Sequence, residues 1–292
     1  VFSIGAYNTL NYYELRKKNF KKISNSEIYR SASFAVIQLG FPLIKSGLFG
    51  LLIGKIISSL IVPIYLFKTS NFKKGKLNTS LLIDLAKRFI DFPKYTNFSI
   101  LLNSLSVNAI NLLIPVIYST KFLGLYSLMY KVLGVPFAFL GNTINQVFLQ
   151  DAVRQKNELG HAYNLTKRMV IQLTFVSVIF FGTAFFIVED FFAFVFGEDW
   201  RISGVYAKYL IPFFMFKFIA SPLTSIHTAF ERQKISFTLQ MIMFVLSMGS
   251  LFYAYINLWV FEHYLLLFSI LMSIFYIFRI ITILKISKNN MI

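Results

Sequence analysis

The sequence predicts an all-α polytopic membrane protein. Of its 292 residues, 57% are hydrophobic and only 14% are charged, whereas a soluble domain is normally about one-quarter charged. Apolar runs close to the roughly 20 residues that cross a hydrocarbon core recur along the whole chain. The positive residues gather in the short segments between these runs, as the topology of helical membrane proteins requires.

The composition also excludes several function classes. The formal net charge of +17 is explained by loop lysines and arginines, so we expect no nucleic-acid partner. The sequence has no cysteine, which excludes disulfides, thiol catalysis and thiolate metal sites. Its three histidines, His161, His227 and His263, share no ligand spacing. We therefore expect neither a metal site nor another cofactor.

Nine membrane-crossing segments are predicted, the first being only the end of a span. The chain begins with Val1 and that first apolar run is short, so we expect further residues ahead of it. The nine predicted segments are 1–13, 28–44, 48–67, 98–118, 122–148, 169–188, 203–229, 235–257 and 264–284.

One helix between these segments has a different pattern. In residues 79–94, Leu82 and Leu85 fall on one side of a helix and Asp84 and Lys87 on the other, which is typical of a helix lying in the membrane interface. Pro93 is expected to end it. We interpret 79–94 as a linker helix between domain 1–78 and domain 95–292.

Loop charges predict the orientation. Of the 29 lysines and arginines, 22 lie in alternate loops, and the opposite loops hold only Lys45, Lys121 and Arg201. Positive loops stay in the cytoplasm, so the C-terminus is predicted to be cytoplasmic. Arg279 is counted among the 22 and is interpreted as a topology anchor rather than a ligand.

Four positive side chains remain inside the predicted spans: Lys55, Lys131, Lys208 and Lys217. All twelve acidic residues lie in loops or at span ends. Buried ammonium groups without carboxylates need carbonyls, water or an anionic ligand, so a cavity that attracts anions is predicted. Lys208 lies near a span end and can also extend to the headgroups.

Uncharged polar residues join these lysines as candidates for the cavity. Two interpretations stay open for each of them, because amides also form hydrogen bonds between helices and tyrosines also form interfacial belts. The candidate substrate-binding residues are Lys131, Lys55, Lys217, Asn103, Asn108, Asn111, Tyr126, Tyr130 and Gln38. Gln240 is a further mid-span amide, interpreted as a contact between helices.

Several motifs carry a family resemblance. FPKY at 92–95, LGLYSLMYKVLGVPFAFLGNTINQVF at 123–148, FGEDW at 196–200 and ASPL at 220–223 resemble Wzx-type polysaccharide flippases of the multidrug/oligosaccharidyl-lipid/polysaccharide (MOP) superfamily. The resemblance covers essentially the whole chain and is strongest over 88–151. Each motif is loose, so their order and spacing carry the likeness.

The resemblance implies a MOP/MATE-like two-lobe bundle of twelve helices, nine of them visible, with 98–284 as the complete second lobe. It implies translocation of undecaprenyl-diphosphate-linked oligosaccharide across the bacterial cytoplasmic membrane, for O-antigen, capsule or exopolysaccharide synthesis. The implied partners are this lipid-linked oligosaccharide, membrane lipid, and the polysaccharide polymerase with its chain-length machinery.

Two alternatives remain. A multidrug exporter of the same superfamily is expected to carry intramembrane acids, which the visible spans lack. A membrane-embedded polysaccharide polymerase is expected to have a large outer loop with catalytic groups. The longest outer loop, 189–202, holds four acids without a partner base, so we do not expect an enzyme.

Overall fold

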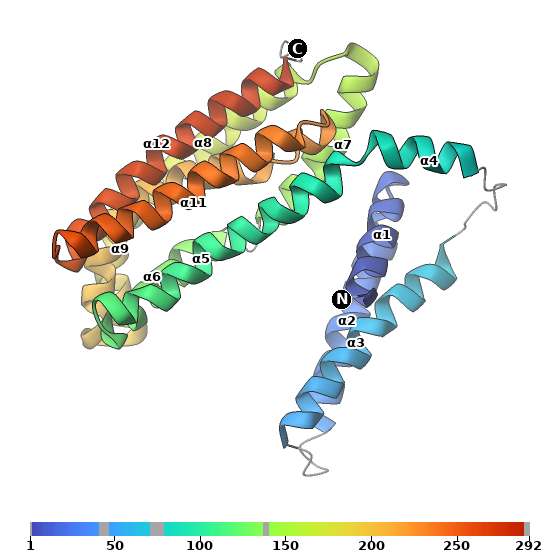
Figure 1. Cartoon of the computed structure of the whole chain (residues 1–292). Helices are drawn as coiled ribbons and strands as arrows, with labels where there is room; N and C mark the ends of the chain where they lie inside the picture. The colour runs from blue at the N-terminus through green and yellow to red at the C-terminus, as the bar shows by residue number, and fades with distance from the viewer. Residues whose placement is uncertain (1, 41–46, 71–78, 137–139, 289–292) are drawn as a thin grey trace. The chain divides into compact units, whose positions relative to one another are not determined.

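The computed structural model describes residues 2–40, 47–70, 79–136 and 140–288, and the regular structure in these ranges is helical (Figure 1). The chain forms two compact units, Val1–Asn78 and Thr79–Ile292. Each unit is described by itself. The assignment of these segments to lobes of a transporter stays a prediction.

The first unit contains three helices, α1 (Phe2–Arg16), α2 (Phe20–Gly40) and α3 (Gly47–Thr69). Helix α3 packs against both others. The fully buried carboxylate of Glu14 accepts hydrogen bonds from Ser70 Oγ, beyond the end of α3, and from Asn19 Nδ2, between α1 and α2. These bonds join the ends of two helices around one buried charge.

The second unit begins with a short helix and a turn and then forms a helical bundle. Its elements are α4 (Thr79–Arg88), a π-helical turn (Phe92–Thr96), α5 (Asn97–Ile117), α6 (Thr120–Pro136), α7 (Asn142–Leu159), α8 (Tyr163–Phe196), α9 (Arg201–Ala220), a 3₁₀ turn (Ser221–Leu223), α10 (Ile226–Ala229), α11 (Gln233–Ile256) and α12 (Phe261–Ser287).

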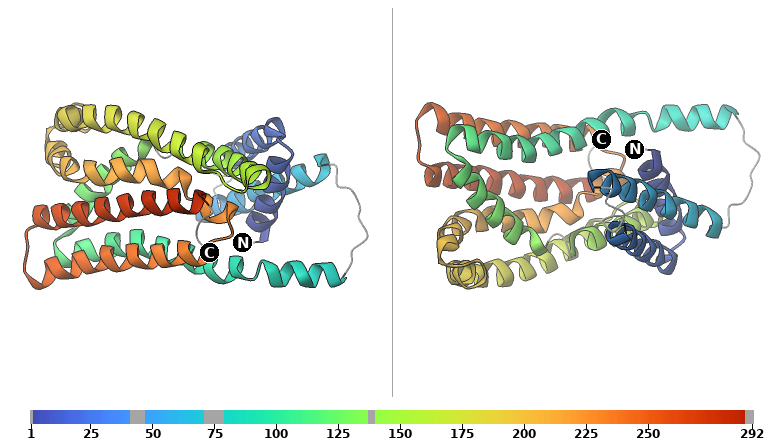
Figure 2. Two further views of the ribbon diagram at one scale, coloured as in Figure 1. Left: turned by 90° about the horizontal axis from the view of Figure 1, so that it is seen from above. Right: turned by 90° about the horizontal axis from the view of Figure 1, so that it is seen from below.

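Helix α9 forms the centre of the second unit. Eleven of its 20 residues are buried, and it packs against α6, α8 and α12. Across the unit the helices follow the order α8, α9, α12 and α11, with α5 paired to α11 (Figure 2). A helix apolar on nearly every side is expected at such a central position.

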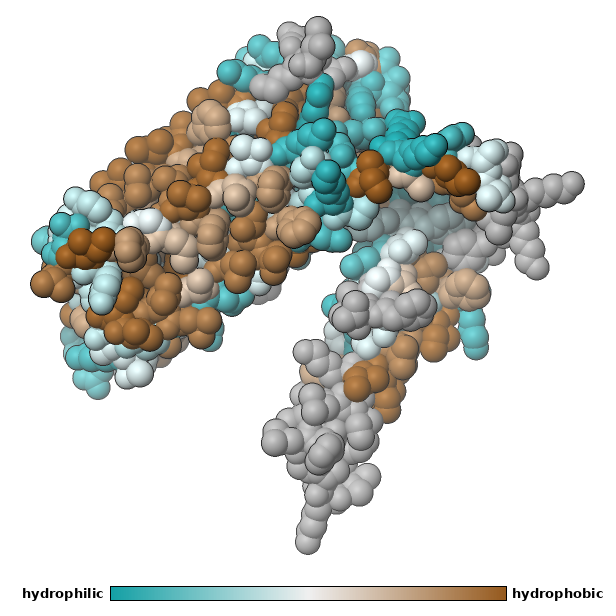
Figure 3. Space-filling model, in the orientation of Figure 1, coloured by the Kyte–Doolittle hydropathy of each residue, from teal (hydrophilic) through white to brown (hydrophobic). Residues whose placement is uncertain are grey.

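Five helical stretches among the described residues are long and apolar enough to cross a membrane: Phe92–Ile117, Tyr163–Phe196, Glu198–Ala229, Gln233–Ile256 and Phe261–Ser287. Apolar side chains cover the middle of the unit's visible face, and hydrophilic side chains gather towards its ends (Figure 3). This distribution is that of a multi-pass membrane protein. The count of nine spans stays a prediction.

The described part of the predicted span 122–148 is helical. Helix α6 is described to Pro136, and the chain is again helical from Leu140 into α7, which begins at Asn142. Asn145 on α7 donates from Nδ2 to Pro222 O at 2.9 Å. The polar residues at the end of the predicted span therefore contact the segment that follows α9.

The linker region also differs in detail from the prediction. Helix α4 ends at Arg88, ahead of Pro93, and Pro93 lies in the first positions of the π-helical turn that leads into α5. Proline is tolerated there because the first N–H groups of a helix lack a partner. Arg88 pairs with Glu231 at 2.9 Å, which attaches the end of α4 to the bundle.

Helices α8 and α9 make their closest approach near one end. A Cβ atom at Gly204 would lie 2.6 Å from Glu189 Cα and 2.8 Å from Val188 O. In the next turn of α9, Lys208 Nζ lies 2.8 Å from Glu189 Oε1. Lys208 thus pairs with a carboxylate of α8, which explains how this predicted in-span cation is accommodated.

The close approach predicts the effect of a methyl group. We expect Gly204→Ala to lower the free energy of unfolding by about 1–3 kcal/mol, because two backbones must separate to accept the new atom. Thermal unfolding of the purified protein in detergent measures this change. Gly182→Ala on α8 is the control, since a Cβ there meets no atom within 4 Å; equal melting temperatures for both variants would contradict the packing argument.

The Glu14 cluster predicts a pH-dependent contribution to stability. Burial alone raises the pKa of Glu14, but the hydrogen bonds from Ser70 and Asn19 and the charge of Lys22 outweigh it and hold the pKa below its ordinary value. Because the pKa of Glu14 is lowered in the folded state, its ionised carboxylate stabilises the unit at pH values above the unfolded-state pKa of roughly 4.3. This stabilisation is lost as the pH falls through the folded-state pKa.

We therefore expect Glu14→Gln to lower the free energy of unfolding by about 1–3 kcal/mol at neutral pH, because a buried network loses its charged acceptor. The difference from the wild type is expected to shrink below pH 4.3 or thereabouts. Melting temperatures at several pH values measure it. Glu27→Gln is the control, because the side chain of Glu27 is partly exposed where it accepts from Tyr7 and pairs with Arg30. A difference independent of pH would contradict the assignment.

Candidate functional site

The second unit contains a partly open cavity of about 600 Å³ between α5, α6, α9, α11 and α12. One side, here called the polar wall, consists of Thr96, Ser99, Asn103, Ser106, Ser236, Gln240 and Ser247 on and beside α5 and α11. The other side, here called the cationic wall, consists of Tyr126, Tyr130, Phe213, Phe214, Lys217, Tyr276 and Arg279 on α6, α9 and α12. None of the described residues that line the cavity is Asp or Glu.

Lys217 lies in an aromatic environment on α9. Its Nζ donates a hydrogen bond to Tyr130 Oη at 2.9 Å. The same nitrogen lies 4.9 Å from the ring centroid of Tyr130 and 5.2 Å from those of Phe213 and Phe214. Ring faces carry partial negative charge and attract cations at these distances, so these rings help the protein to hold an ammonium group at this position.

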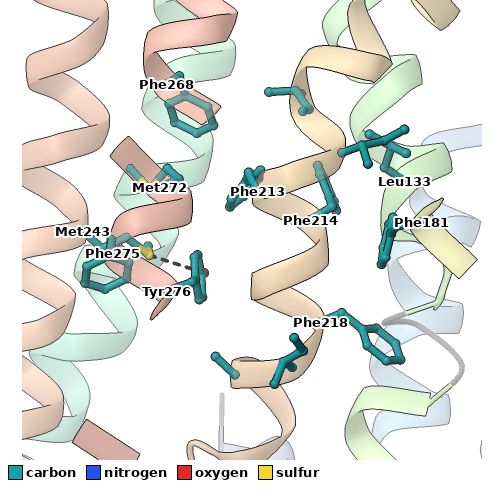
Figure 4. Packing of buried hydrophobic residues seen from close by; sticks show 14 of the residues in the cluster. Leu133, Phe181, Phe213, Phe214, Phe218, Met243, Phe268, Met272, Phe275 and Tyr276 are labelled. Carbon is teal, nitrogen blue, oxygen red and sulfur yellow. Dashed lines mark hydrogen bonds between the residues drawn. The ribbon is translucent and has the colours of Figure 1, made fainter. Parts of the chain in front are cut away.

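The aromatic residues of α9 are fixed by packing on both sides of that helix. Phe213 lies on the side of α9 that faces Met272 and Tyr276, and Phe218 lies on the side that faces Phe181 (Figure 4). The ring centroids of Phe213 and Tyr276 are 5.8 Å apart, and those of Phe181 and Phe218 are 6.2 Å apart. Phe213 and Phe214, whose rings lie near Lys217, therefore belong to the buried core.

Arg279, which the sequence analysis assigned to topology, also lines the cavity. Its side chain is only 8% exposed and lines the cavity, with its guanidinium carbon 6.0 Å from the ring centroid of Tyr276. Spacing was the signal that could have found it. Counting back from Arg279 in steps of three, four and four gives Tyr276, Met272 and Phe268, all of which line the cavity because they share one helix face.

The polar wall is joined by an amide pair. Gln240 Nε2 on α11 donates to Asn103 Oδ1 on α5 at 3.3 Å. Gln240 is 5% exposed, whereas Asn103 is exposed. Each amide has further donors and acceptors beyond this one bond. The interpretation of Gln240 as a contact between helices and the prediction of Asn103 as a cavity residue therefore describe two ends of one interaction.

The remaining candidates from the sequence divide into three groups. Tyr126 and Tyr130 line the cavity, with ring centroids 5.6 Å apart. Lys131 is exposed and lies outside the cavity lining, as do Asn111 and Asn108, whose Nδ2 donates to Ser104 O on its own helix at 2.9 Å. The side chains of Lys55 and Gln38 lie outside the described residues. Their assignment to a substrate site stays a prediction.

The arrangement favours the binding of an anion that also carries hydroxyl or amide groups. The side chains of Lys217 and Arg279 both line the cavity, and two cations that line one cleft attract an anion to it. Arginine offers a planar set of donors suited to phosphate or carboxylate, and lysine acts as a point charge. Opposite them, the polar wall offers hydroxyl and amide groups for uncharged parts of a ligand.

The fold and the site together define an all-helical, multi-pass membrane protein with a cationic cavity in its larger unit. A family model described as "Polysaccharide biosynthesis protein" matches residues 1–204 of the 292. The chain therefore belongs to this family of polysaccharide biosynthesis proteins. No curated protein and no solved structure matches the chain. The matched region ends at Gly204, so Lys217, Gln240 and Arg279 lie beyond it.

The cavity predicts a difference between two lysines. We expect Lys217→Met to weaken binding of inorganic pyrophosphate to the purified protein about tenfold or more, because a charge-assisted hydrogen bond to the anion is lost. Lys131→Met is the matched control and is expected to bind like the wild type, since its side chain is exposed outside the cavity lining. An equal loss of pyrophosphate affinity in the two variants would contradict this difference and would support Lys131 as a binding residue.

Proposed function

We propose that this protein is a Wzx-type flippase of the MOP superfamily that moves undecaprenyl-diphosphate-linked oligosaccharide across the bacterial cytoplasmic membrane. The observation that carries the proposal is a cavity with two cations and no carboxylate among its described lining residues, in a membrane protein of a polysaccharide biosynthesis family. A diphosphate attached to a sugar and a long apolar chain matches these features.

In the proposed complex each wall contacts a different part of the ligand. Lys217 and Arg279 attract the diphosphate, because both charges face a cavity without acids among its described lining. Asn103 and Gln240 exchange hydrogen bonds with sugar hydroxyls, and Tyr126 and Tyr130 offer aromatic surface to the sugar rings. The isoprenoid chain stays in the surrounding lipid. Translocation of this kind requires no bond to be made or broken, so the protein is proposed not to be an enzyme.

The resemblance and the loop charges complete the proposal. Residues 95–292 form the second of two six-helix lobes, and residues 1–78 belong to the first. The two lobes expose the cavity alternately to each side of the membrane. The C-terminus is cytoplasmic, because the loop lysines and arginines alternate in that sense. A polysaccharide polymerase with its chain-length machinery receives the translocated repeat units.

A complementation assay tests this function. The complete gene is expressed in a bacterium that lacks its own flippase and makes a matched repeat unit. We expect surface polysaccharide to return and lipid-linked repeat units to stop accumulating at the cytoplasmic face. Arg279→Gln is expected to lower the rate of translocation about tenfold or more, because a buried cation facing the diphosphate is removed.

Arg154→Gln is the control for this substitution. Arg154 lies on α7 with half of its side chain exposed and pairs with Asp151 at the surface, so its loss is expected to leave polysaccharide unchanged. No restoration by the wild type, despite confirmed membrane insertion, would contradict the proposed function. A panel of drug sensitivities would then test the exporter of the same superfamily.

A further inference from the structure

The segment that leads into α5 is joined by side chains to the segment that begins α11. The contacts are two ion pairs followed by a pair of rings, here called the entry contacts: Arg88–Glu231 at 2.9 Å, Asp91–Lys234 at 3.8 Å, and Tyr95–Phe237 with ring centroids 5.8 Å apart. They end beside the cavity, because Thr96 and Ser236, the sequence neighbours of the ring pair, both line the cavity. The entry contacts therefore hold together the beginnings of the two helices that carry the polar wall.

Glu231 has an unusual backbone for a residue of its type. Its φ is 55°, in the left-handed region that glutamate rarely adopts. Such a conformation persists where the surrounding contacts determine it, and it often marks a functional position. The carboxylate of Glu231 pairs with two cations from different elements, Arg88 at the end of α4 and Lys156 on α7, the second at 3.8 Å. Because Lys156 also donates to Ala229 O at 2.8 Å, the turn that carries Glu231 is fastened to α7.

The first half of α5 depends on such contacts because it contributes little to the core. The buried residues of α5 are Ser106, Ile110 and Ile114, and none of its described residues ahead of Ser106 is buried. The π-helical turn before α5 is a rare and irregular element, and it packs against α11. Asn103, which accepts from Gln240 in the polar wall, lies in this first half. Burial in the core therefore does little to position Asn103, whereas the entry contacts hold the chain that precedes it.

We propose that Glu231 is a positioning residue for the polar wall. Its ion pair with Arg88 holds the start of α5 against α11, so that Asn103 and Gln240 meet a ligand in the cavity at a fixed separation. Glu231 itself lies outside the cavity lining and acts only through these helices. The inference rests on the proposed function, because it takes the sugar of a lipid-linked diphosphate as the group that the polar wall binds.

This role divides the affinity of the cavity into two parts. Loss of the carboxylate of Glu231 loosens the first half of α5, which carries hydroxyl and amide groups of the polar wall. Lys217 and Arg279 belong to α9 and α12, which the entry contacts do not join. The contribution of a sugar to affinity is therefore expected to fall while the contribution of the diphosphate stays the same. Because exposed ion pairs contribute little to global stability, the protein is expected to stay folded.

Two probes that differ only in the sugar test the proposal. Both are diphosphate diesters of equal charge, one joining farnesol to methanol and the other joining farnesol to N-acetylglucosamine. Isothermal calorimetry measures their affinities for the full-length protein in nanodiscs. We expect the wild type to bind the sugar-bearing probe about tenfold more tightly, because the polar wall gains hydrogen bonds to the sugar. Glu231→Asn is expected to reduce this difference about 3-fold or more and to bind the methyl probe like the wild type.

Asparagine is chosen because it removes the charge of Glu231 and still tolerates the left-handed backbone. Arg88→Gln removes the other end of the ion pair without changing that turn, and it is expected to cause a similar loss. The double variant is expected to lose no more than Glu231→Asn alone, because both substitutions act through one contact. Asp151→Asn is the matched control, since the side chains of Asp151 and Glu231 are both 35% exposed and Asp151 pairs with Arg154. This control is expected to bind both probes like the wild type.

Failure of this inference and failure of the proposed function give different results. If Glu231→Asn and Arg88→Gln bind both probes like the wild type, or weaken both probes equally, the ion pair does not position the polar wall and the proposed function is unaffected. Losses that add in the double variant would also overturn the inference. If the wild type binds the two probes equally, the polar wall does not bind the sugar, and the inference fails while the diphosphate stays as the ligand. If the wild type binds neither probe, the proposed function and the inference fail together.

Discussion

A positive charge inside a helical membrane bundle must be solvated by the protein itself, and the rest of the second unit is arranged around this requirement. The described contacts of Lys217 include the hydroxyl of Tyr130 and the rings of Tyr130, Phe213 and Phe214. Those rings belong to α6 and α9, so the packing of these two helices places the groups that stabilise the charge. Arg279 is held less completely, because its Nε lacks a hydrogen-bond partner among the described residues.

The central helix α9 combines a rigid half with an irregular end. Near its start, Gly204 allows contact between its backbone and that of α8. After its end, the chain passes through a 3₁₀ turn at Pro222 and the single turn of α10, and Asn145 supplies a donor to the carbonyl of Pro222. The side chains of the cationic wall on α9 lie between these two regions. Their positions are therefore set by close packing on one side and by a polar contact on the other.

Much of the architecture could be predicted from hydrophobicity, because long apolar runs have few structures available in a membrane. The all-helical, multi-pass class and the family of polysaccharide biosynthesis proteins follow from such runs and from loose motifs. The direction in which a given side chain points from its helix was harder to predict. Lys131 and Lys217 are both mid-span lysines, yet only Lys217 lines the cavity, and this depends on how α6 and α9 pack.

Arg279 and the end of the segment 122–148 show two further limits of the sequence. Loop counting treats a cation near a span end as a topology signal, and Arg279 was assigned to that role although its helix face continues that of Tyr276. The segment 122–148 has the length and composition of a span, but its last residues bind the region after α9 rather than lipid. In both cases a partner distant in sequence decides the outcome, and periodicity within one helix carries no information about that partner.

Because the cavity has a polar wall and a cationic wall, substitutions that alter hydrogen bonding and substitutions that alter charge fall on different helices. The polar wall comes from α5 and α11 and the cationic wall from α6, α9 and α12. Replacement of a serine or an amide on the first pair of helices alters hydrogen bonding without disturbing the charges on the other three. The hydrogen-bonding groups and the positive charges of the cavity can therefore be changed separately, by substitutions on different helices.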